Sequence, residues 1–219
     1  MDNIKLFIFD LDGVIVDTAK YHYLAWKEIA EKYRFHFSEK DNERLKGVSR
    51  MVSLDILLSI GNLSLPQQEK KIIAEIKNER YKDFISNMTP NEILPGAKEF
   101  LETVKLSGFK TALASASKNA GFILEKLNLI ALFDTIIDGN SVQNAKPNPE
   151  IFLKAAQNVN VIPVHCIVFE DAQAGVQAAK AAGMRCIGVG SPKVLKDADF
   201  VISGLDKINL KTLQNILYK

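Results

Sequence analysis

The sequence is poor in cysteine, histidine and tryptophan. Its 219 residues include two cysteines, three histidines and one tryptophan. Cys166 and Cys186 both stand in apolar, strand-like runs, where buried free thiols are the expected state. The cysteines and histidines do not form a cluster with the spacing of a zinc site. This use of cysteine favours a cytoplasmic location.

The sequence also lacks a strong charge of one sign and a long apolar run. Lys and Arg number 28 against 26 Asp and Glu, which leaves a formal net charge of +2. Such a balance argues against nucleic acid or an acidic membrane as the main partner. No apolar run approaches the length of a membrane span, and "MDNIKLFIFD" lacks the basic region of a secretory signal. We expect a small-molecule partner, no nucleic acid, no membrane and a monomeric chain.

Short apolar runs are present in number, and helical patterns separate them. With 47% hydrophobic residues, the chain has enough apolar material for a sizeable core. The runs with strand character are residues 4–9, 109–115, 134–139, 166–171, 185–190 and 199–204. Strands that alternate with helices predict an α/β fold, here a Rossmann-like, mainly parallel sheet with helices on both faces.

One stretch breaks this alternation. Residues 18–88 contain helical patterns, punctuated by Gly47, Gly61 and Pro66, and no convincing strand. The stretch is too long for an ordinary loop. We therefore predict an inserted, all-helical cap domain over residues 17–92, and a core made of residues 1–16 and 93–219.

Charged and polar residues follow the predicted strands. Asp10 and Asp12 come directly after the first run, on alternate positions, and Gly13 then lets the chain turn. The residues expected after later strands are Ser115, Ala116, Ser117, Lys118, Asn119, Lys146, Glu170 and Asp171. Because parallel strands end at one edge of a sheet, these groups should converge there.

Four converging carboxylates repel one another unless a cation neutralises them. Oxygen ligands select a hard divalent ion, and Mg²⁺ is the usual one with phosphate substrates. Hydroxyl and lysine groups beside such a cluster suit a phosphoryl group. We also expect "SASKN" (115–119) to begin a helix with Ser117 as N-cap, an end that attracts phosphate. One carboxylate is then positioned to attack phosphorus.

Each signal is weak by itself. An Asp-x-Asp pair is common by chance, and Glu170 with Asp171 also fits an acid pair at a helix N-terminus. The informative observation is that four groups occur together, each after a predicted strand: Asp10 with Asp12, the loop 115–119, Lys146, and Glu170 with Asp171.

Four segments resemble the signature motifs of the haloacid dehalogenase superfamily: "FDLDGVIVDT", "LASAS", "KPNPEIF" and "FEDAQAGVQAAKAAGM". The resemblance spans essentially the whole chain and implies that the helical insertion is that superfamily's cap. It implies that Asp10 is a nucleophile that forms an aspartyl-phosphate, and that Asp12 is the general acid/base. The implied Mg²⁺ ligands are Asp10, Asp12 (through its backbone carbonyl), Glu170 and Asp171. Phe169, before the acidic pair, is bulkier than expected and should fill the sheet edge.

Further segments closely resemble the β-phosphoglucomutase family: residues 17–26, 42–50, 77–78 and 113–119. Those enzymes interconvert β-glucose 1-phosphate and glucose 6-phosphate through β-glucose 1,6-bisphosphate. The implied phosphate-binding residues are Arg50, Ser115, Ala116, Ser117, Lys118, Asn119 and Lys146. The residues implied to contact the sugar or shape the cap pocket are Trp26, Lys46, Gly47, Val48, Ser49, Ser53 and Lys77. Thr18 and His22 are implied to couple cap closure to Asp12.

Plainer interpretations remain open for several of these residues. Lys46 and Lys77 fit solvated helix charges, His22 fits a partly exposed structural histidine, and Trp26 fits the core of the cap. The segment 61–71 matches no pattern that we can interpret.

A second anion site favours a mutase, which must hold a bisphosphate in either of two orientations. Arg50 and Lys118 are the cations that suit such a site. A phosphatase for sugar phosphates or other small phosphomonoesters needs one anion site only, and it remains the alternative. A phospho-ligand sensor needs no nucleophile, so the intact acidic set argues against it.

Overall fold

A computed structural model describes residues 3–217. Within that range it contains a six-stranded sheet in the order β3-β2-β1-β4-β5-β6, with every pair parallel. The strands are β1 (Leu6–Phe9), β2 (Lys110–Ala114), β3 (Thr135–Ile137), β4 (Cys166–Glu170), β5 (Arg185–Val189) and β6 (Phe200–Ile202). The helices of this part are α5 (Ala97–Leu106), α6 (Ala120–Lys126), α7 (Glu150–Asn158), α8 (Gln173–Ala181) and α9 (Leu210–Leu217). The predicted Rossmann-like α/β fold is confirmed.

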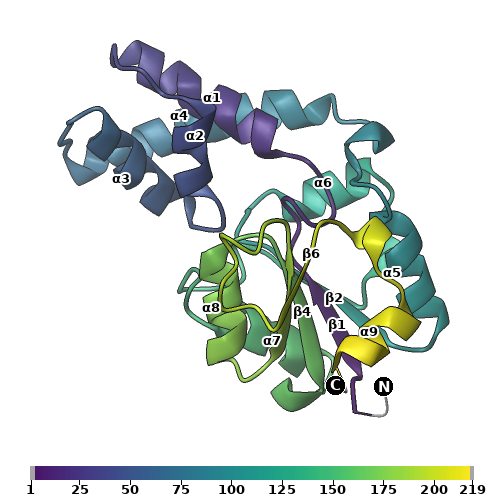
Figure 1. The fold of residues 1–219 in the computed structure, drawn as a ribbon. Coiled ribbons are helices and arrows are strands. Elements are labelled where there is room, and N and C mark those ends of the chain that lie inside the picture. Colours follow the sequence, from purple (N-terminus) through teal and green to yellow (C-terminus); the bar gives the residue numbers. More distant parts are fainter. Residues whose placement is uncertain (1–2, 218–219) are drawn as a thin grey trace.

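Both faces of β1 are covered by helices (Figure 1). Alternate side chains of a strand point to opposite faces, so Leu6 and Ile8 join one apolar cluster and Phe7 and Phe9 the other. The first cluster includes side chains of α7 and α8, and the second includes side chains of α5, α6 and α9. A strand buried on both faces is continuously apolar, which explains the run at residues 4–9.

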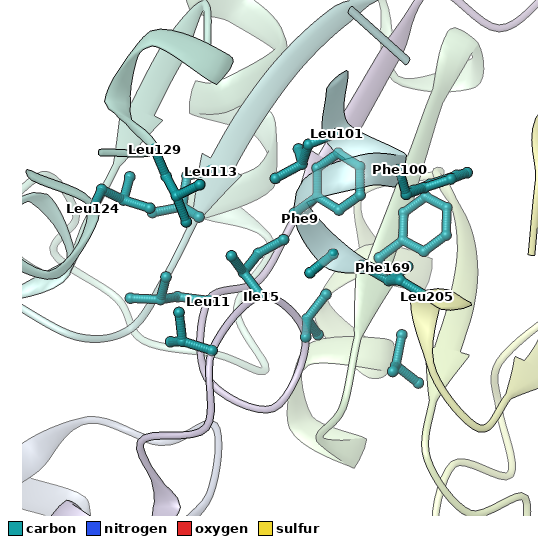
Figure 2. Packing of buried hydrophobic residues seen from close by; sticks show 14 of the residues in the cluster. Phe9, Leu11, Ile15, Phe100, Leu101, Leu113, Leu124, Leu129, Phe169 and Leu205 are labelled. Carbon is teal, nitrogen blue, oxygen red and sulfur yellow. The ribbon is translucent and has the colours of Figure 1, made fainter. Parts of the chain in front are cut away.

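An aromatic cluster supports the strand that leads to Asp10 (Figure 2). The rings of Phe9 and Phe169 stack with centroids 4.9 Å apart, and Phe100 of α5 meets Phe169 edge-on at 5.5 Å. Phe169 is fully buried one residue before the end of β4, which agrees with the expectation that it fills the edge where the strands end. Phe9 and Phe169 are direct partners across β1 and β4, so the stacked rings lie one position before Asp10 and Glu170.

A group of helices lies beyond the carboxyl ends of the strands (Figure 1). These helices are α1 (Ala19–Lys32), α2 (Glu39–Asn42), α3 (Arg50–Ile60) and α4 (Gln67–Ser86). Residues 19–86 contain helices and loops but no strand, as predicted. Of these, α1, α3 and α4 share an apolar cluster that includes Trp26, Leu54 and Ile73, so they bury their apolar faces against one another.

The two connections between these helices and the sheet run side by side. Val16 and Ile93 form an antiparallel bridge. The Asp17 amide donates to the Glu92 carbonyl at 2.9 Å, and the Leu94 amide donates to the Ile15 carbonyl at 2.9 Å. The chain therefore leaves the sheet and returns to it at neighbouring points.

The structure bears on the state of the cysteines and on the search for a membrane-spanning helix. Cys166 and Cys186 are free and buried, as predicted. Among residues 3–217, no helix combines the length and apolarity needed to span a bilayer.

Candidate active site

Three carboxylates and one lysine meet at the carboxyl ends of β1 and β4. Asp10 directly follows β1, and its amide donates to the Phe169 carbonyl at 2.9 Å. The fully buried Lys146 ammonium lies 2.5 Å from Asp10 Oδ1 and 2.8 Å from Glu170 Oε2. It also donates to the Ala114 carbonyl at the end of β2, at 3.1 Å. One cation thus joins groups from three neighbouring strand ends.

Asp10, Glu170 and Asp171 each direct a carboxylate oxygen to a common point. These oxygens all lie within 4.8 Å of one another. Burial, reinforced by the charge of Asp10, raises the pKa of Glu170 to about 7 despite Lys146. Burial and the charges of Glu170 and Asp10 raise the pKa of Asp171 well above its ordinary value. A divalent cation would reverse both shifts, because it stabilises the ionised carboxylates.

The charge balance and the ligand chemistry both fit Mg²⁺. Lys146 supplies one positive charge against three carboxylates. Its pKa is raised because the charges of Asp10 and Glu170 outweigh its burial. The remaining two negative charges and the all-oxygen donor set match a hard divalent ion. The residues present therefore fit the metal that the sequence predicts.

Two glycines allow these carboxylates to lie close to the backbone. A Cβ atom at Gly175, in α8, would overlap the carboxyl group of Glu170, and one at Gly13 would overlap that of Asp171. Gly13 also has φ +76°, a backbone conformation that L side chains rarely adopt. The glycine after the Asp-x-Asp segment thus makes room for the third carboxylate as well as for the turn.

Asp12 has an environment unlike that of Asp10. It is half-buried, accepts a hydrogen bond from the Thr18 hydroxyl, and lies outside the three-carboxylate cluster. Burial, and next the charge of Asp10, raises its pKa to about 6, although Thr18 and Lys146 oppose the shift. A carboxyl group that titrates near neutral pH is suited to transfer protons in both directions.

The loop after β2 gathers hydroxyl and amide groups without forming the predicted helix start. Ser115 is buried, and its Oγ accepts from the Ser117 amide at 3.1 Å. The Ser117 Oγ accepts from the Asn119 amide at 3.2 Å, and α6 begins only at Ala120. The prediction of Ser117 as N-cap was wrong: Asn119 occupies that position and makes no side-chain cap bond. Lys118 is exposed and Ala116 half-buried.

The loop before α3 approaches the acidic cluster from the helical side. Gly47 has φ +70°, and a Cβ atom there would clash with Ala172, the residue after Asp171. The Lys46 charge opposes the raised pKa of Asp171, although its ammonium pairs with Glu43 at 2.9 Å. Val48 is half-buried, Ser49 accepts from the Val52 amide as N-cap of α3, and buried Ser53 donates to the Leu45 carbonyl. These residues shape the loop and the start of α3.

Lys77 is buried, contrary to the interpretation as a solvated helix charge. Only 2% of it is exposed, and its ammonium lies 2.9 Å from His22 Nδ1. It lies over the rings of Trp26 and Tyr81, 4.8 and 4.5 Å from their centroids. Burial, with a smaller effect of Arg50, lowers the pKa of Lys77 to about 7. The pKa of His22 falls well below its ordinary value through burial and the charge of Lys77.

Sequence reasoning missed two residues of α4. The side-chain oxygen of Asn78 accepts from Arg50 at 2.7 Å and from Asn119 at 3.0 Å, so it joins the helices to the loop after β2. Tyr81 is buried beside His22, with ring centroids 4.2 Å apart. Tyr81 follows Lys77 by four positions on the same helix face, which was an available signal. Asn78 lies in the segment 77–78 that resembles the β-phosphoglucomutase family, but no role was assigned to it.

Residues 4–183 match the haloacid dehalogenase-like hydrolase family. The chain belongs to this family. The predicted membership is therefore confirmed over most of the sequence, including the whole segment from β1 to the end of α8.

Several proteins resemble this haloacid dehalogenase-like hydrolase closely. It is 43% identical over 211 residues to "Beta-phosphoglucomutase" of Bacillus subtilis (strain 168), which covers 95% of this chain and 93% of that protein. It is 35% identical over 182 residues to "Phosphorylated carbohydrates phosphatase" of Thermotoga maritima, covering 82% of each chain. The crystal structure of beta-phosphoglucomutase from Clostridium difficile superposes with a TM-score of 0.92 at 45% identity. It covers 97% of this chain and 96% of that one.

Proposed function

We propose that this protein interconverts β-glucose 1-phosphate and glucose 6-phosphate through β-glucose 1,6-bisphosphate, as a β-phosphoglucomutase. The observation that supports this most is the contact of Arg50 and Asn119 through Asn78. This contact brings together donors from Arg50 and Asn119, next in sequence to the exposed Lys118. They form a second group of donors, separate from Lys146 at Asp10. A bisphosphate needs two anion sites at once, whereas a simple phosphatase needs one. The similarity to named β-phosphoglucomutases adds to this argument.

In this proposal Asp10 is the nucleophile. Its free oxygen attacks phosphorus, the bond from phosphorus to the sugar oxygen breaks, and an aspartyl-phosphate forms. Lys146 and Ser115 hold the reacting phosphoryl group. Mg²⁺, held by Asp10, Glu170, Asp171 and the backbone carbonyl of Asp12, supplies charge neutralisation between carboxylate and phosphate.

Asp12 moves the proton in both halves of the reaction. It donates a proton to the sugar oxygen that leaves phosphorus, which is consistent with a pKa of about 6. The trace bisphosphate first phosphorylates Asp10. The 6-hydroxyl of β-glucose 1-phosphate then attacks this aspartyl-phosphate: Asp12 takes the hydroxyl proton, the bond from phosphorus to Asp10 breaks, and β-glucose 1,6-bisphosphate forms. After the bisphosphate reorients, Asp10 attacks the phosphorus at C1, Asp12 returns the proton to the C1 oxygen, and glucose 6-phosphate leaves with the aspartyl-phosphate restored.

The remaining residues bind and orient. Arg50, Lys118 and Asn119 hold the phosphate that is not reacting, with Ala116 and Ser117 in the same loop. The sugar contacts or is enclosed by Trp26, Lys46, Gly47, Val48, Ser49, Ser53 and Lys77. Thr18 and His22 connect the helices to Asp12, and residues 17–92 act as a cap that limits access of water to the aspartyl-phosphate.

One assay separates the mutase from the alternative. The protein is mixed with β-glucose 1-phosphate, Mg²⁺ and a trace of β-glucose 1,6-bisphosphate, and glucose 6-phosphate and free phosphate are followed separately. A mutase produces glucose 6-phosphate with little free phosphate. Free phosphate without glucose 6-phosphate would instead establish a sugar phosphatase, the activity suggested by the Thermotoga maritima relative. Neither product, over a wide panel of phosphomonoesters, would favour a sensor.

The matched variants for this assay are Asp10→Asn and Asp17→Asn. Asp10→Asn should abolish turnover while the thermal unfolding profile remains cooperative, because the nucleophile is lost and the strand is not. Asp17 is exposed in the same segment and should tolerate the change. Retained activity in Asp10→Asn would remove Asp10 as the nucleophile.

We further propose a monomeric enzyme of the cytoplasm. Two buried free thiols are consistent with a reducing compartment. Sedimentation at several protein concentrations tests the monomer, and a mass that grows with concentration would contradict it.

A further inference from the structure

Among residues 3–217, only the side chain of Asn78 is hydrogen-bonded to both Arg50 and Asn119. Asn78 lies in α4, Arg50 begins α3, and Asn119 precedes α6. One oxygen, Oδ1 of Asn78, accepts from the Arg50 guanidinium at 2.7 Å and from the side-chain amide of Asn119 at 3.0 Å. These three residues lie far apart in the sequence, so this atom connects the helical part of the chain to the sheet part.

The contact occupies few of the available donors. A guanidinium has five N–H groups, and the bond to Asn78 uses one from Arg50. Within residues 3–217 the other guanidinium donors have no hydrogen-bond partner. Asn119 likewise donates one of its two amide hydrogens. The shared acceptor fixes the direction of both side chains and leaves the remaining donors for a ligand.

The acceptor is neutral, which matters because Arg50 is half-buried. A carboxylate at this position would form a salt bridge with the guanidinium and compete with a phosphate. An amide oxygen orients the guanidinium without pairing it with a carboxylate. The charges of Glu79 and Glu75 act on Arg50, but burial outweighs them and lowers its pKa. Asparagine thus holds Arg50 in place without forming a salt bridge to it.

We propose that Asn78 is a positioning residue, which holds the Arg50 guanidinium and the Asn119 amide in one orientation for the phosphate that is not reacting. This rests on the proposed function. Asn78 acts through Arg50 and Asn119, and it serves the helical part and the sheet part at once. Its loss should therefore affect the binding of a sugar phosphate more than chemistry at Asp10.

The test compares Asn78→Leu with Asn87→Leu, a matched change at an exposed asparagine that ends the same helix. Glucose 6-phosphate is titrated calorimetrically onto each protein in Mg²⁺, and turnover is measured with β-glucose 1-phosphate and with a small aryl phosphate. Asn78→Leu should weaken glucose 6-phosphate binding about 10- to 100-fold, the range for misplaced groups in a site. Aryl phosphate turnover should fall much less, and Asn87→Leu should resemble the wild type.

Two further variants separate positioning from a general structural role. In a background that carries both Arg50→Ala and Asn119→Ala, Asn78→Leu should add about twofold at most, because both of its partners are already absent. Losses that multiply would overturn the proposal. Asn78→Asp keeps both acceptor bonds but neutralises Arg50, so it should weaken binding at least as much as Asn78→Leu; wild-type affinity would contradict the need for a neutral acceptor.

The failure of this inference is distinguishable from failure of the proposed function. Wild-type protein that binds glucose 6-phosphate but does not interconvert the two phosphates would refute the mutase, and the calorimetric comparison would still test Asn78. Tighter binding by Asn78→Leu would show that Asn78 competes with phosphate, which overturns its positioning role. Absence of binding by the wild type would overturn both.

Discussion

The hydroxyl of Thr18 donates a hydrogen bond to the carboxylate of Asp12. Thr18 is fully buried at the residue before α1, while Asp12 belongs to the loop after β1. The contact therefore joins the first residue of the helical part to the carboxyl group that we assign to proton transfer. It also stabilises the ionised form of Asp12, since a hydrogen bond to a carboxylate lowers its pKa.

Thr18→Val should move the acidic limb of the pH profile upward. Without the donated hydrogen bond the pKa of Asp12 rises above its value of about 6, so a higher pH is needed to ionise it. The measurement is kcat/KM for β-glucose 1-phosphate against pH at saturating Mg²⁺, because this ratio reports groups of the free enzyme. Thr103→Val is the control, since its hydroxyl bonds the Glu99 carbonyl on exposed α5 surface. An unmoved limb would contradict the assignment.

Gly175→Ala and Gly121→Ala should change stability in opposite directions. Alanine is normally better than glycine inside a helix by about 1 kcal/mol, and a Cβ atom at Gly121 meets nothing within 4 Å. At Gly175 the same atom overlaps Glu170, so we expect a loss of about 1–3 kcal/mol and weaker Mg²⁺ binding. Urea unfolding and a Mg²⁺ titration measure the two effects. Similar behaviour of both variants would show that Glu170 is not confined by α8.

Lys77→Met should stabilise the protein at pH 7, and less so as the pH rises. Burial lowers the pKa of Lys77 from 10.5 to about 7. Between these values the unfolded chain binds a proton that the folded chain lacks, so unfolding is favoured more at pH 7 than at pH 10. Removing the amine should raise the unfolding free energy by on the order of 3 kcal/mol near pH 7, less any lost ring contacts.

The measurement for Lys77 is urea unfolding at pH 7 and at pH 9.5. The advantage of Lys77→Met should shrink at the higher pH, because the wild-type unfolded chain then loses much of its extra proton. Lys71→Met, at an exposed position of the same helix, should show no pH-dependent difference. A constant advantage at both pH values would mean that Lys77 is charged when folded.

Arg50→Ala should reduce mutase turnover far more than the hydrolysis of a small aryl phosphate. The guanidinium is expected to hold the second phosphate, which an aryl phosphate does not have. A loss of about 10- to 100-fold in kcat/KM for β-glucose 1-phosphate is expected when a charged hydrogen bond is removed. Arg44→Ala, at an exposed neighbouring position, is the control. Equal losses on both substrates would exclude Arg50 as the second-phosphate anchor.

Most of the fold and the acidic part of the site could be predicted from local patterns. Strands covered on both faces are continuously apolar, and parallel strands end at one edge, so Asp10, Glu170 and Asp171 could be grouped before any coordinates were known. The amphipathic spacing of Leu210, Leu213 and Leu217 was available as well, although no prediction covered α9.

The residues that escaped prediction are those whose environment comes from elsewhere in the chain. Lys77 has the pattern of a solvated helix charge, but Trp26 of α1 covers it. Ser117 has the chemistry of an N-cap, but its hydroxyl instead closes a turn with Asn119. Asn78 meets Arg50 and Asn119 across 28 and 41 residues, a separation that leaves no local periodicity.

The bridge between Val16 and Ile93 bears on how a helical segment can be inserted into a chain of this fold. The residues where the chain leaves the sheet and returns to it are hydrogen-bonded neighbours. The segment that contains α1–α4 therefore begins and ends at adjacent points, as the residues of a tight turn do. The entropy of closing a loop grows only slowly with its length, so segments of very different size can be exchanged at this point without disturbing β1.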